Sequence, residues 1–208
     1  MKHSHDFDFK LQFTKTGRPF IIVDNFLTHA EYLTVINELD TIIRPNMRRE
    51  ETGGAISPEG KSLKNNNACF VNDIYADPKN SPTFRILKKF FENKGFTNKL
   101  VESHWAFDWF TKFGVEESMQ FLYYDQKDSY GKHVDTMDTT ALLWLCKEPQ
   151  GFEGGDFIIE DTEKVEFKNN RMVIFKVGTY HGVEPITRTS ELEGHGRYCV
   201  SKFMRPLL

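Results

Sequence analysis

Two histidines and one aspartate in the second half of the chain have residue types and spacing suited to binding a metal ion. His133 and Asp135 are two residues apart in an apolar segment, so in a strand both side chains point to the same face. His181 opens a later apolar segment. Two imidazoles and a carboxylate on one side of an ion leave coordination positions open for other molecules. The sequence therefore predicts a metal site at His133, Asp135 and His181.

Other interpretations of these three residues remain open at this point. A His-x-Asp pair is common by chance, and it could be a surface ion pair with a separate histidine buried in the core. Zinc also accepts two histidines and a carboxylate. A zinc site, however, would leave the basic residue that follows His181, Arg197, without a role.

Arg197 lies in the last apolar segment, where alternation decides which residues face inward. Arg197, Cys199, Ser201 and Phe203 share one face, and Lys202 lies on the opposite face, which fits solvent or an outer helix. An arginine inside a sheet is costly unless its charge is paired, and a guanidinium offers two parallel donors to a carboxylate. The pattern favours an inward Arg197 that binds a dicarboxylate ligand; an outward, solvated arginine is the alternative.

The element pattern around these residues predicts a mainly β fold with flanking helices. Eight short apolar segments separated by turn residues are typical of a β-sandwich or barrel. We expect a double-stranded β-helix, or jelly roll, of about eight strands in two four-stranded sheets, buttressed by N-terminal helices. The eight predicted strands are Ser118–Tyr124, Tyr130–Asp135, Thr140–Cys146, Gly155–Glu160, Lys164–Lys168, Arg171–Val177, His181–Thr187 and Gly196–Met204.

The first half of the chain mixes a strand, two helices and a long loop. After a predicted strand at Pro19–Val23, Thr28 and Glu31 have capping-box spacing at the start of a predicted helix over 29–42. A second helix opens at Ser81-Pro82 and is expected to end at Gly95. The segment Arg44–Asn67 has no apolar period, so it is either a functional lid or simply mobile.

Composition limits the class of protein. The chain has 208 residues and a formal net charge of −3, with three widely spaced cysteines. We expect a single domain over 1–208, with residues 1–115 as support and 116–208 as the jelly-roll core. The charge offers no basic excess for nucleic acid, and the cysteines predict reduced thiols rather than disulfides. Without a signal-peptide or membrane-spanning pattern, a soluble cytoplasmic protein is expected.

The run from about Gln120 to Pro206 resembles the Fe(II)/2-oxoglutarate-dependent oxygenases, and within them the prolyl 4-hydroxylase-like branch. The matching landmarks occur in the same order as in that branch. They are Tyr123, His133-Val134-Asp135, Leu142-Leu143-Trp144-Leu145, Gly154-Gly155-Asp156-Phe157, Asn170–Phe175, His181-Gly182-Val183-Glu184-Pro185 and Arg197-Tyr198. One departure is the segment 188–195, which makes the interval between His181 and Arg197 longer than is usual in the branch.

The resemblance implies roles for individual residues. His133, Asp135 and His181 would hold Fe(II) and carry catalysis, and Arg197 would bind the distal carboxylate of 2-oxoglutarate. The remaining expected pocket residues are Tyr123, which would contribute its phenol, and Thr140, Leu142 and Trp144, which alternate along one strand face. The implied co-substrates are 2-oxoglutarate and O2; whether ascorbate is also needed is left open.

The activity implied by the resemblance is hydroxylation of an unactivated C–H bond with release of succinate and CO2. The expected substrate is a prolyl residue in a peptide or protein, or a free amino acid, with no nucleic-acid or membrane partner; the oligomeric state is left open. One alternative is a 2-oxoglutarate oxygenase that acts on another small molecule or a nucleobase. A second alternative is a non-catalytic jelly-roll binding module, which would have no reason to align the metal-binding residues with Arg197.

Overall fold

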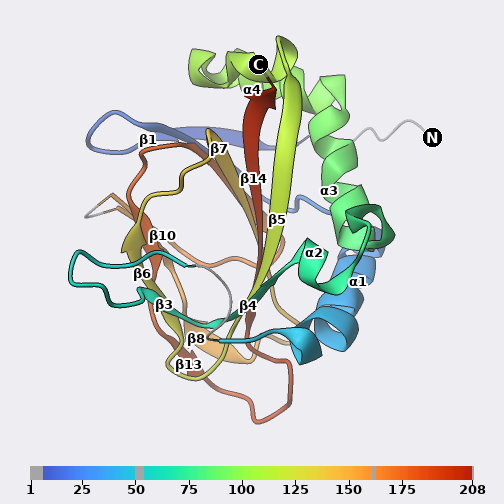
Figure 1. Cartoon of the computed structure of the whole chain (residues 1–208), viewed down its shortest axis with the longest axis vertical. Coiled ribbons are helices and arrows are strands. Elements are labelled where there is room, and N and C mark those ends of the chain that lie inside the picture. Colours follow the sequence, from blue (N-terminus) through green and yellow to red (C-terminus); the bar gives the residue numbers. More distant parts are fainter. Residues whose placement is uncertain (1–6, 50–53, 161–162, 208) are drawn as a thin grey trace.

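The computed structural model describes residues 7–49, 54–160 and 163–207. Figure 1 shows two sheets on either side of an enclosed interior, with helices covering the outer face of one of them. The long strands β5 and β14 run through the centre, α1 and α3 lie to one side, and β3, β6 and β10 lie to the other. Among the described residues, no helix has the length and apolar character needed to cross a membrane.

The larger sheet has the strand order β1-β2-β11-β7-β14-β5-β4. Its longest strands form the antiparallel pair β5–β14, which stays in register along the full length of both strands. Its strands are β1 (Phe9–Phe13), β2 (Pro19–Val23), β4 (Asn67–Phe70), β5 (Gly114–Tyr124), β7 (Thr139–Leu145), β11 (Arg171–Lys176) and β14 (Arg197–Leu207).

The smaller sheet has the order β10-β9-β12-β6-β3 and faces the larger one. A two-stranded ribbon, β8 with β13, lies beside it. The strands of these two sheets are β3 (Lys64–Asn65), β6 (Ser129–His133), β8 (Phe152–Gly154), β9 (Phe157–Ile159), β10 (Glu163–Val165), β12 (His181–Val183) and β13 (Ile186–Arg188).

This arrangement confirms the predicted jelly roll buttressed by helices, but the expected division into two four-stranded sheets is wrong. The predicted strand at His181–Thr187 is broken into β12 and β13, which belong to different sheets. The N-terminal strands also join the sheets: β2 pairs with β11, β4 with β5, and β3 with β6. Residues before 115 therefore extend both sheets, because their strands pair with edges that the later strands leave open.

The helices begin where the sequence places their caps. Thr28 and Glu31 form the predicted capping box at the start of α1, and Ser81 caps α3. The prediction that Gly95 ends the second helix is wrong: α3 stops at Glu92, and Asn93 then caps α4. The helical elements are α1 (His29–Glu38), η1 (Leu39–Ile43), η2 (Arg44–Asn46), α2 (Val71–Ile74), η3 (Pro78–Asn80), α3 (Pro82–Glu92), α4 (Lys94–Ser103) and η4 (Trp105–Thr111).

Two apolar cores lie on opposite faces of the larger sheet. One core packs the helices against its outer face, and the other fills the space between the two sheets. Along β14 this alternation places Arg197 inward and Lys202 outward, as the sequence predicts. Lys202 is fully buried under α3, where it pairs with Glu117 and lies over the rings of Phe84 and Phe91.

Candidate metal and co-substrate site

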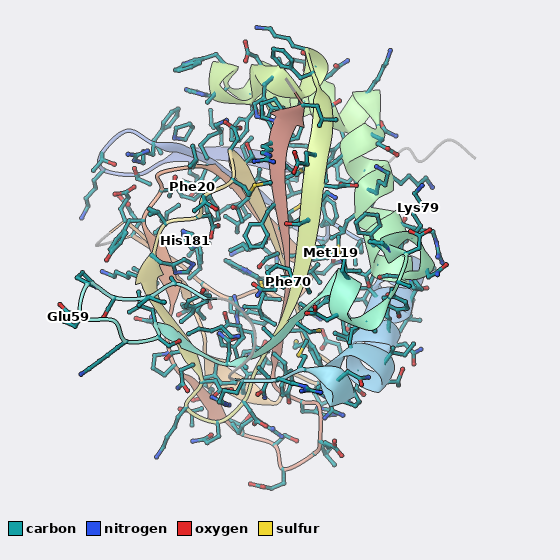
Figure 2. The ribbon with its side chains drawn as sticks, viewed as in Figure 1. Phe20, Glu59, Phe70, Lys79, Met119 and His181 are labelled. Atoms are coloured by element: carbon teal, nitrogen blue, oxygen red, sulfur yellow. The ribbon has the colours of Figure 1, made fainter. Side chains whose placement is uncertain are left out.

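Pairing of β6 with β12 brings the two predicted histidine ligands together. His133 and His181 are cross-strand partners in this antiparallel pair. Gly182 permits the close approach, because a Cβ there would lie 2.8 Å from the carbonyl oxygen of Tyr130. Figure 2 shows His181 on the smaller-sheet side of the molecule, away from the helices. The histidine that is distant in sequence thus reaches the His-x-Asp pair through strand pairing.

The geometry of His133, Asp135 and His181 fits a shared metal ion. One ligand atom from each residue lies within 4.8 Å of the other two. The Nε2 atoms of His133 and His181 lie 3.7 and 3.6 Å from the two carboxylate oxygens of Asp135. These residues are mostly buried but the site remains reachable. The alternative of a surface ion pair and a separate core histidine does not describe this arrangement.

Backbone carbonyls select the nitrogen that each histidine presents. His133 Nδ1 lies 2.9 Å from the carbonyl oxygen of Gly131, and His181 Nδ1 lies 2.9 Å from that of Thr179. A carbonyl only accepts hydrogen bonds, so both Nδ1 atoms carry hydrogen and both Nε2 atoms have free lone pairs. Metal-binding histidines are usually held in this way by a second hydrogen bond.

Asp135 is oriented by a hydroxyl from the opposite sheet. Thr140 Oγ1 donates to Asp135 Oδ2 at 2.6 Å. Thr140 is 1% exposed at the start of β7, so the bond crosses the interior between the sheets. The resemblance implies that Thr140 lines the co-substrate pocket; in the structure its hydroxyl contacts the carboxylate of Asp135, a candidate metal ligand.

Burial keeps the His181 ring in the neutral form that binds metals. Desolvation lowers the pKa of His181 to about 4, against the opposing effect of Asp135, which favours the charged ring. The rings of Phe175 and Phe157 pack against it, with centroids 4.6 and 5.5 Å away. On the other side of the two histidines, the ring of Tyr130 stacks on that of His133, with centroids 4.1 Å apart. The donor set and its aromatic surroundings therefore fit Fe(II) bound by neutral imidazoles.

Arg197 is fully buried, and none of its three guanidinium nitrogens has a hydrogen-bond partner among the described residues. Among the described residues, three aromatic faces surround its charge: the ring centroids of Tyr124, Trp144 and Phe167 lie 4.9, 5.2 and 5.4 Å from its central carbon, and the Cys199 thiol is also close. Such contacts compensate a buried cation only in part. The donors that remain fit a carboxylate, as expected for the distal end of 2-oxoglutarate.

Gly155 makes room for this arginine. Its φ is +74°, a conformation that favours glycine, and a Cβ there would lie 3.0 Å from Cδ of Arg197. Gly155 is therefore explained by close packing against the buried arginine, and Gly154 by its approach to the backbone, since a Cβ there would lie 2.6 Å from the carbonyl oxygen of Pro185.

One cavity is lined by His133, Asp135 and His181, the three candidate metal ligands, and its wall extends toward Arg197. Leu142 lines it, and the Nε1 of nearby Trp144 is a buried donor without a partner among the described residues. The lining residues are Gln120, Leu122, Tyr124, Tyr130, His133, Asp135, Leu142, Phe157, His181, Gly182, Val183, Cys199, Ser201 and Phe203. The three candidate metal ligands thus share one cavity, and the donors of Trp144 and Arg197, unpartnered among the described residues, are buried outside its lining.

The structure corrects the expected place of Tyr123. Its ring belongs to the outer core and packs against Tyr198, and its hydroxyl accepts a hydrogen bond from the Gly196 amide. Tyr124, one residue later on β5, lines the cavity instead. Strand side chains alternate between faces, so an error of one residue moves the phenol to the opposite side. Burial raises the pKa of the Tyr124 phenol, which therefore stays protonated and can donate a hydrogen bond.

The long segment 44–67 is partly a hairpin beside the metal site. Residues 50–53 of this predicted lid lie outside the described residues. The Leu63 amide donates to the Ala55 carbonyl, and the Gly131 amide donates to the Leu63 carbonyl. The Ala55 amide donates to the hydroxyl of Tyr130, the residue that stacks on His133. Figure 2 shows Glu59, at the tip, projecting from the same side of the molecule as His181.

Sequence reasoning missed three residues that shape the site. Tyr124 ends a predicted strand and Gly155 stands inside a quoted landmark, but only strand register and packing show their contacts with Arg197. Tyr130 carried a usable signal: it is the aromatic residue closest before His133, and aromatic residues at strand starts commonly pack against neighbouring rings.

Comparison with known proteins agrees with this geometry. Residues 119–205 match the family described as the 2OG-Fe(II) oxygenase superfamily. A PKHD-type hydroxylase of Gloeothece citriformis is 32% identical over 91 residues, which cover 38% of this chain and 41% of that protein. A PKHD-type hydroxylase of Acinetobacter baylyi is 33% identical over 86 residues, covering 34% of this chain and 37% of that protein. The matched region thus spans about two fifths of these relatives.

Solved structures share the fold at low sequence identity. A Pseudomonas putida prolyl-4-hydroxylase superposes with a TM-score of 0.56 at 15% identity, covering 91% of this chain and 93% of that chain. The viral collagen prolyl hydroxylase of Paramecium bursaria Chlorella virus-1 gives a TM-score of 0.56 at 14% identity, covering 90% and 96%. These matches extend the common fold to the N-terminal strands and helices.

Proposed function

We propose that this chain is an Fe(II)- and 2-oxoglutarate-dependent hydroxylase. Its residues 119–205 match the 2OG-Fe(II) oxygenase superfamily, and its fold is similar to that of a prolyl-4-hydroxylase. One observation carries the proposal. A facial set of two histidines and an aspartate shares an interior with a fully buried arginine that has no hydrogen-bond partner among the described residues. A dicarboxylate bound to the metal at one end and to Arg197 at the other satisfies both.

The chain's own residues supply position and environment in this mechanism. His133, Asp135 and His181 would hold the metal, and Arg197 would bind the distal carboxylate. When bound, Fe(II), 2-oxoglutarate and O2 supply the oxidising power that converts a C–H bond to an alcohol, with succinate and CO2 as the other products. The aromatic rings around His181 and Arg197 exclude water from the reaction.

The substrate that we propose is a prolyl residue in a peptide or protein, with a free amino acid as the alternative. Support comes from relatives and fold neighbours described as PKHD-type and prolyl hydroxylases. The hairpin around Ala55 and Leu63 lies at the site, where it could contact an extended peptide. The N-terminal strands complete both sheets, which supports residues 1–208 acting as one domain.

Turnover of 2-oxoglutarate tests the proposal directly. Protein loaded anaerobically with Fe(II) should form succinate once O2 is admitted, and peptides and amino acids can be screened for a mass gain of one oxygen. Assays with and without ascorbate decide whether it is required. Asp135→Ala should abolish succinate formation. Asp138→Ala is the matched control, since Asp138 pairs with Lys176 and lies outside the metal-binding set. Equal turnover in Asp135→Ala and wild type would overturn the assignment.

A further inference from the structure

Gln120 is a buried polar side chain that neither the metal set nor the arginine anchor explains. It is 5% exposed in β5 and lines the cavity that contains His133, Asp135 and His181. Its carboxamide makes no hydrogen bond with any other described residue. A carboxamide has two N–H donors and an acceptor oxygen, and those of Gln120 are not among the fully enclosed polar atoms, so they are open to the cavity.

Ser201 lies beside Gln120, and its hydroxyl also has no strong hydrogen-bond partner among the described residues. The two residues are cross-strand partners in the β14–β5 pair, and Ser201 is also 5% exposed and lines the same cavity. Within the part of the chain that the structure describes, its hydroxyl has the sulfur of Cys199, at 3.9 Å, as a weak partner. Two adjacent hydrogen-bonding groups therefore face the cavity without a strong protein partner.

The register of the larger sheet places this pair between the arginine anchor and the metal. Inward residues on β5, β14 and β7 form successive rungs, which are about 6.6 Å apart because each rung is two residues along a strand. The Gln120–Ser201 rung is next to the rung of Thr140, which holds Asp135. From the anchor toward the metal, the rungs are Tyr124–Arg197; Leu122–Cys199–Trp144; Gln120–Ser201–Leu142; and Phe203–Thr140.

We propose that Gln120 and Ser201 bind the metal-proximal end of 2-oxoglutarate by donating hydrogen bonds to its carboxylate or keto oxygen. The proposal rests on the proposed function, because it assumes that 2-oxoglutarate spans from Arg197 to the metal. The chemistry required is an oxygen acceptor at this rung. A carbonyl of the hydroxylated substrate has the same chemistry, but the rung lies on the path from anchor to metal, which favours the co-substrate.

Binding to protein loaded with Mn(II), measured by calorimetry, tests this without turnover. Two ligands separate the two ends of the pocket: 2-oxoglutarate uses the metal and Arg197, whereas oxalate uses only the metal-proximal end. Gln120→Leu should weaken both ligands about tenfold, because a hydrogen bond to a charged group is lost. Ser201→Ala should weaken both by a smaller factor. Arg197→Met should weaken 2-oxoglutarate and leave oxalate unchanged.

Two further variants keep the test informative. Gln120→Glu preserves size but places a negative charge beside the ligand carboxylate, so it should weaken both ligands more than Gln120→Leu. Gln12→Leu, the same kind of replacement at an exposed position of the edge strand β1, is the matched control and should change neither affinity. If Gln120→Leu and Gln120→Glu bind both ligands as the wild type does, the proposal is overturned. A raised KM for the peptide in these variants would then assign the pair to the substrate. Failure of wild-type protein to bind 2-oxoglutarate would instead overturn the proposed function.

Discussion

His133 and His181 lie directly opposite each other in the β6–β12 pair, and their ring centroids are 4.4 Å apart. The strand register between these two residues therefore sets the spacing of two metal ligands. A change that moves β12 relative to β6 should lower metal affinity more than it lowers the stability of the fold, because the two histidines lie on the cavity wall.

Gly182→Val tests this dependence on register. The added side chain would collide with the backbone of Tyr130 and Lys132, 2.8 and 3.1 Å from the new Cβ, and push β12 away from β6. We expect metal affinity to fall by about tenfold or more, the range seen when ligand orientation is disturbed. Titration with Mn(II) measures the loss. Gly114→Ala, whose Cβ would meet only the flexible Leu207 side chain, should bind normally; normal metal affinity in Gly182→Val would contradict the argument.

Thr140→Val removes the hydroxyl that orients Asp135 and keeps the side-chain volume. Metal affinity should fall roughly 10- to 100-fold, the usual effect of losing a group that positions a ligand. Thr97→Val, at a buried position of α4, is the control for the same replacement away from the site. If the Thr140 variant binds Mn(II) as wild type does and loses only 2-oxoglutarate affinity, then Thr140 serves the co-substrate, as the resemblance implies.

Arg197→Met should separate ligand binding from stability. It should weaken 2-oxoglutarate by about one to three orders of magnitude, since a charge-assisted contact in a partly buried site contributes roughly 2–5 kcal/mol. Without ligand the variant should unfold at the same or a higher Tm, because a buried charge without a hydrogen-bond partner is removed. Differential scanning calorimetry with and without 2-oxoglutarate measures both effects.

Arg171→Met is the contrasting control, since Arg171 hydrogen-bonds to Asp24 at 2.6 Å. It should lower Tm and leave 2-oxoglutarate affinity unchanged. A large drop in the Tm of ligand-free Arg197→Met would show that the buried guanidinium is stabilised by contacts beyond the aromatic rings.

The Asp24 cluster predicts a dependence of stability on pH. Hydrogen bonds from Arg171, with Lys168 and Lys10 nearby, hold the pKa of Asp24 well below its usual range. The unfolded chain thus takes up this proton first, so the stabilisation is present above about pH 4 and is lost as pH falls further. Asp24→Asn should lower the free energy of unfolding by about 2 kcal/mol at pH 7 and by less at pH 3. Urea unfolding at both values checks this; an equal difference at both would contradict it.

The hairpin beside Tyr130 should respond to substrate. Its tip is a tight turn in which the Gly60 amide donates to the Ser57 carbonyl, with side chains exposed to solvent. We expect tip amides to exchange quickly with deuterium in the unliganded protein and more slowly when a peptide substrate binds. The amides of Leu63 and Gly131, bonded within the hairpin and to it, should be protected throughout. Full protection of the tip before substrate is added would count against a lid.

Much of the site could be predicted from local patterns. The two-residue period of a strand places His133 and Asp135 on one face whatever surrounds them, and the same rule points Arg197 and Ser201 inward together. Caps are equally local: Thr28 and Ser81 accept hydrogen bonds from amides within their own first helical turns. These features depend on a few neighbouring residues, so sequence alone carries them.

Other features depend on which strand lies beside which. Tyr123 and Tyr124 are adjacent in sequence, and only the register of β5 against β14 decides which phenol enters the cavity. The bond from Thr140 to Asp135 crosses from one sheet to the other, and Gly155 meets Arg197 from a distant turn.

The ligand types, the inward charge and the class of fold could be predicted from the chain, because they follow from side-chain chemistry and backbone period. The hydroxyl bonded to Asp135, the inward tyrosine and the Gln120–Ser201 pair became visible once the strands were packed together. These contacts join strands far apart in the chain, and their distances are set by sheet packing, which no local pattern encodes.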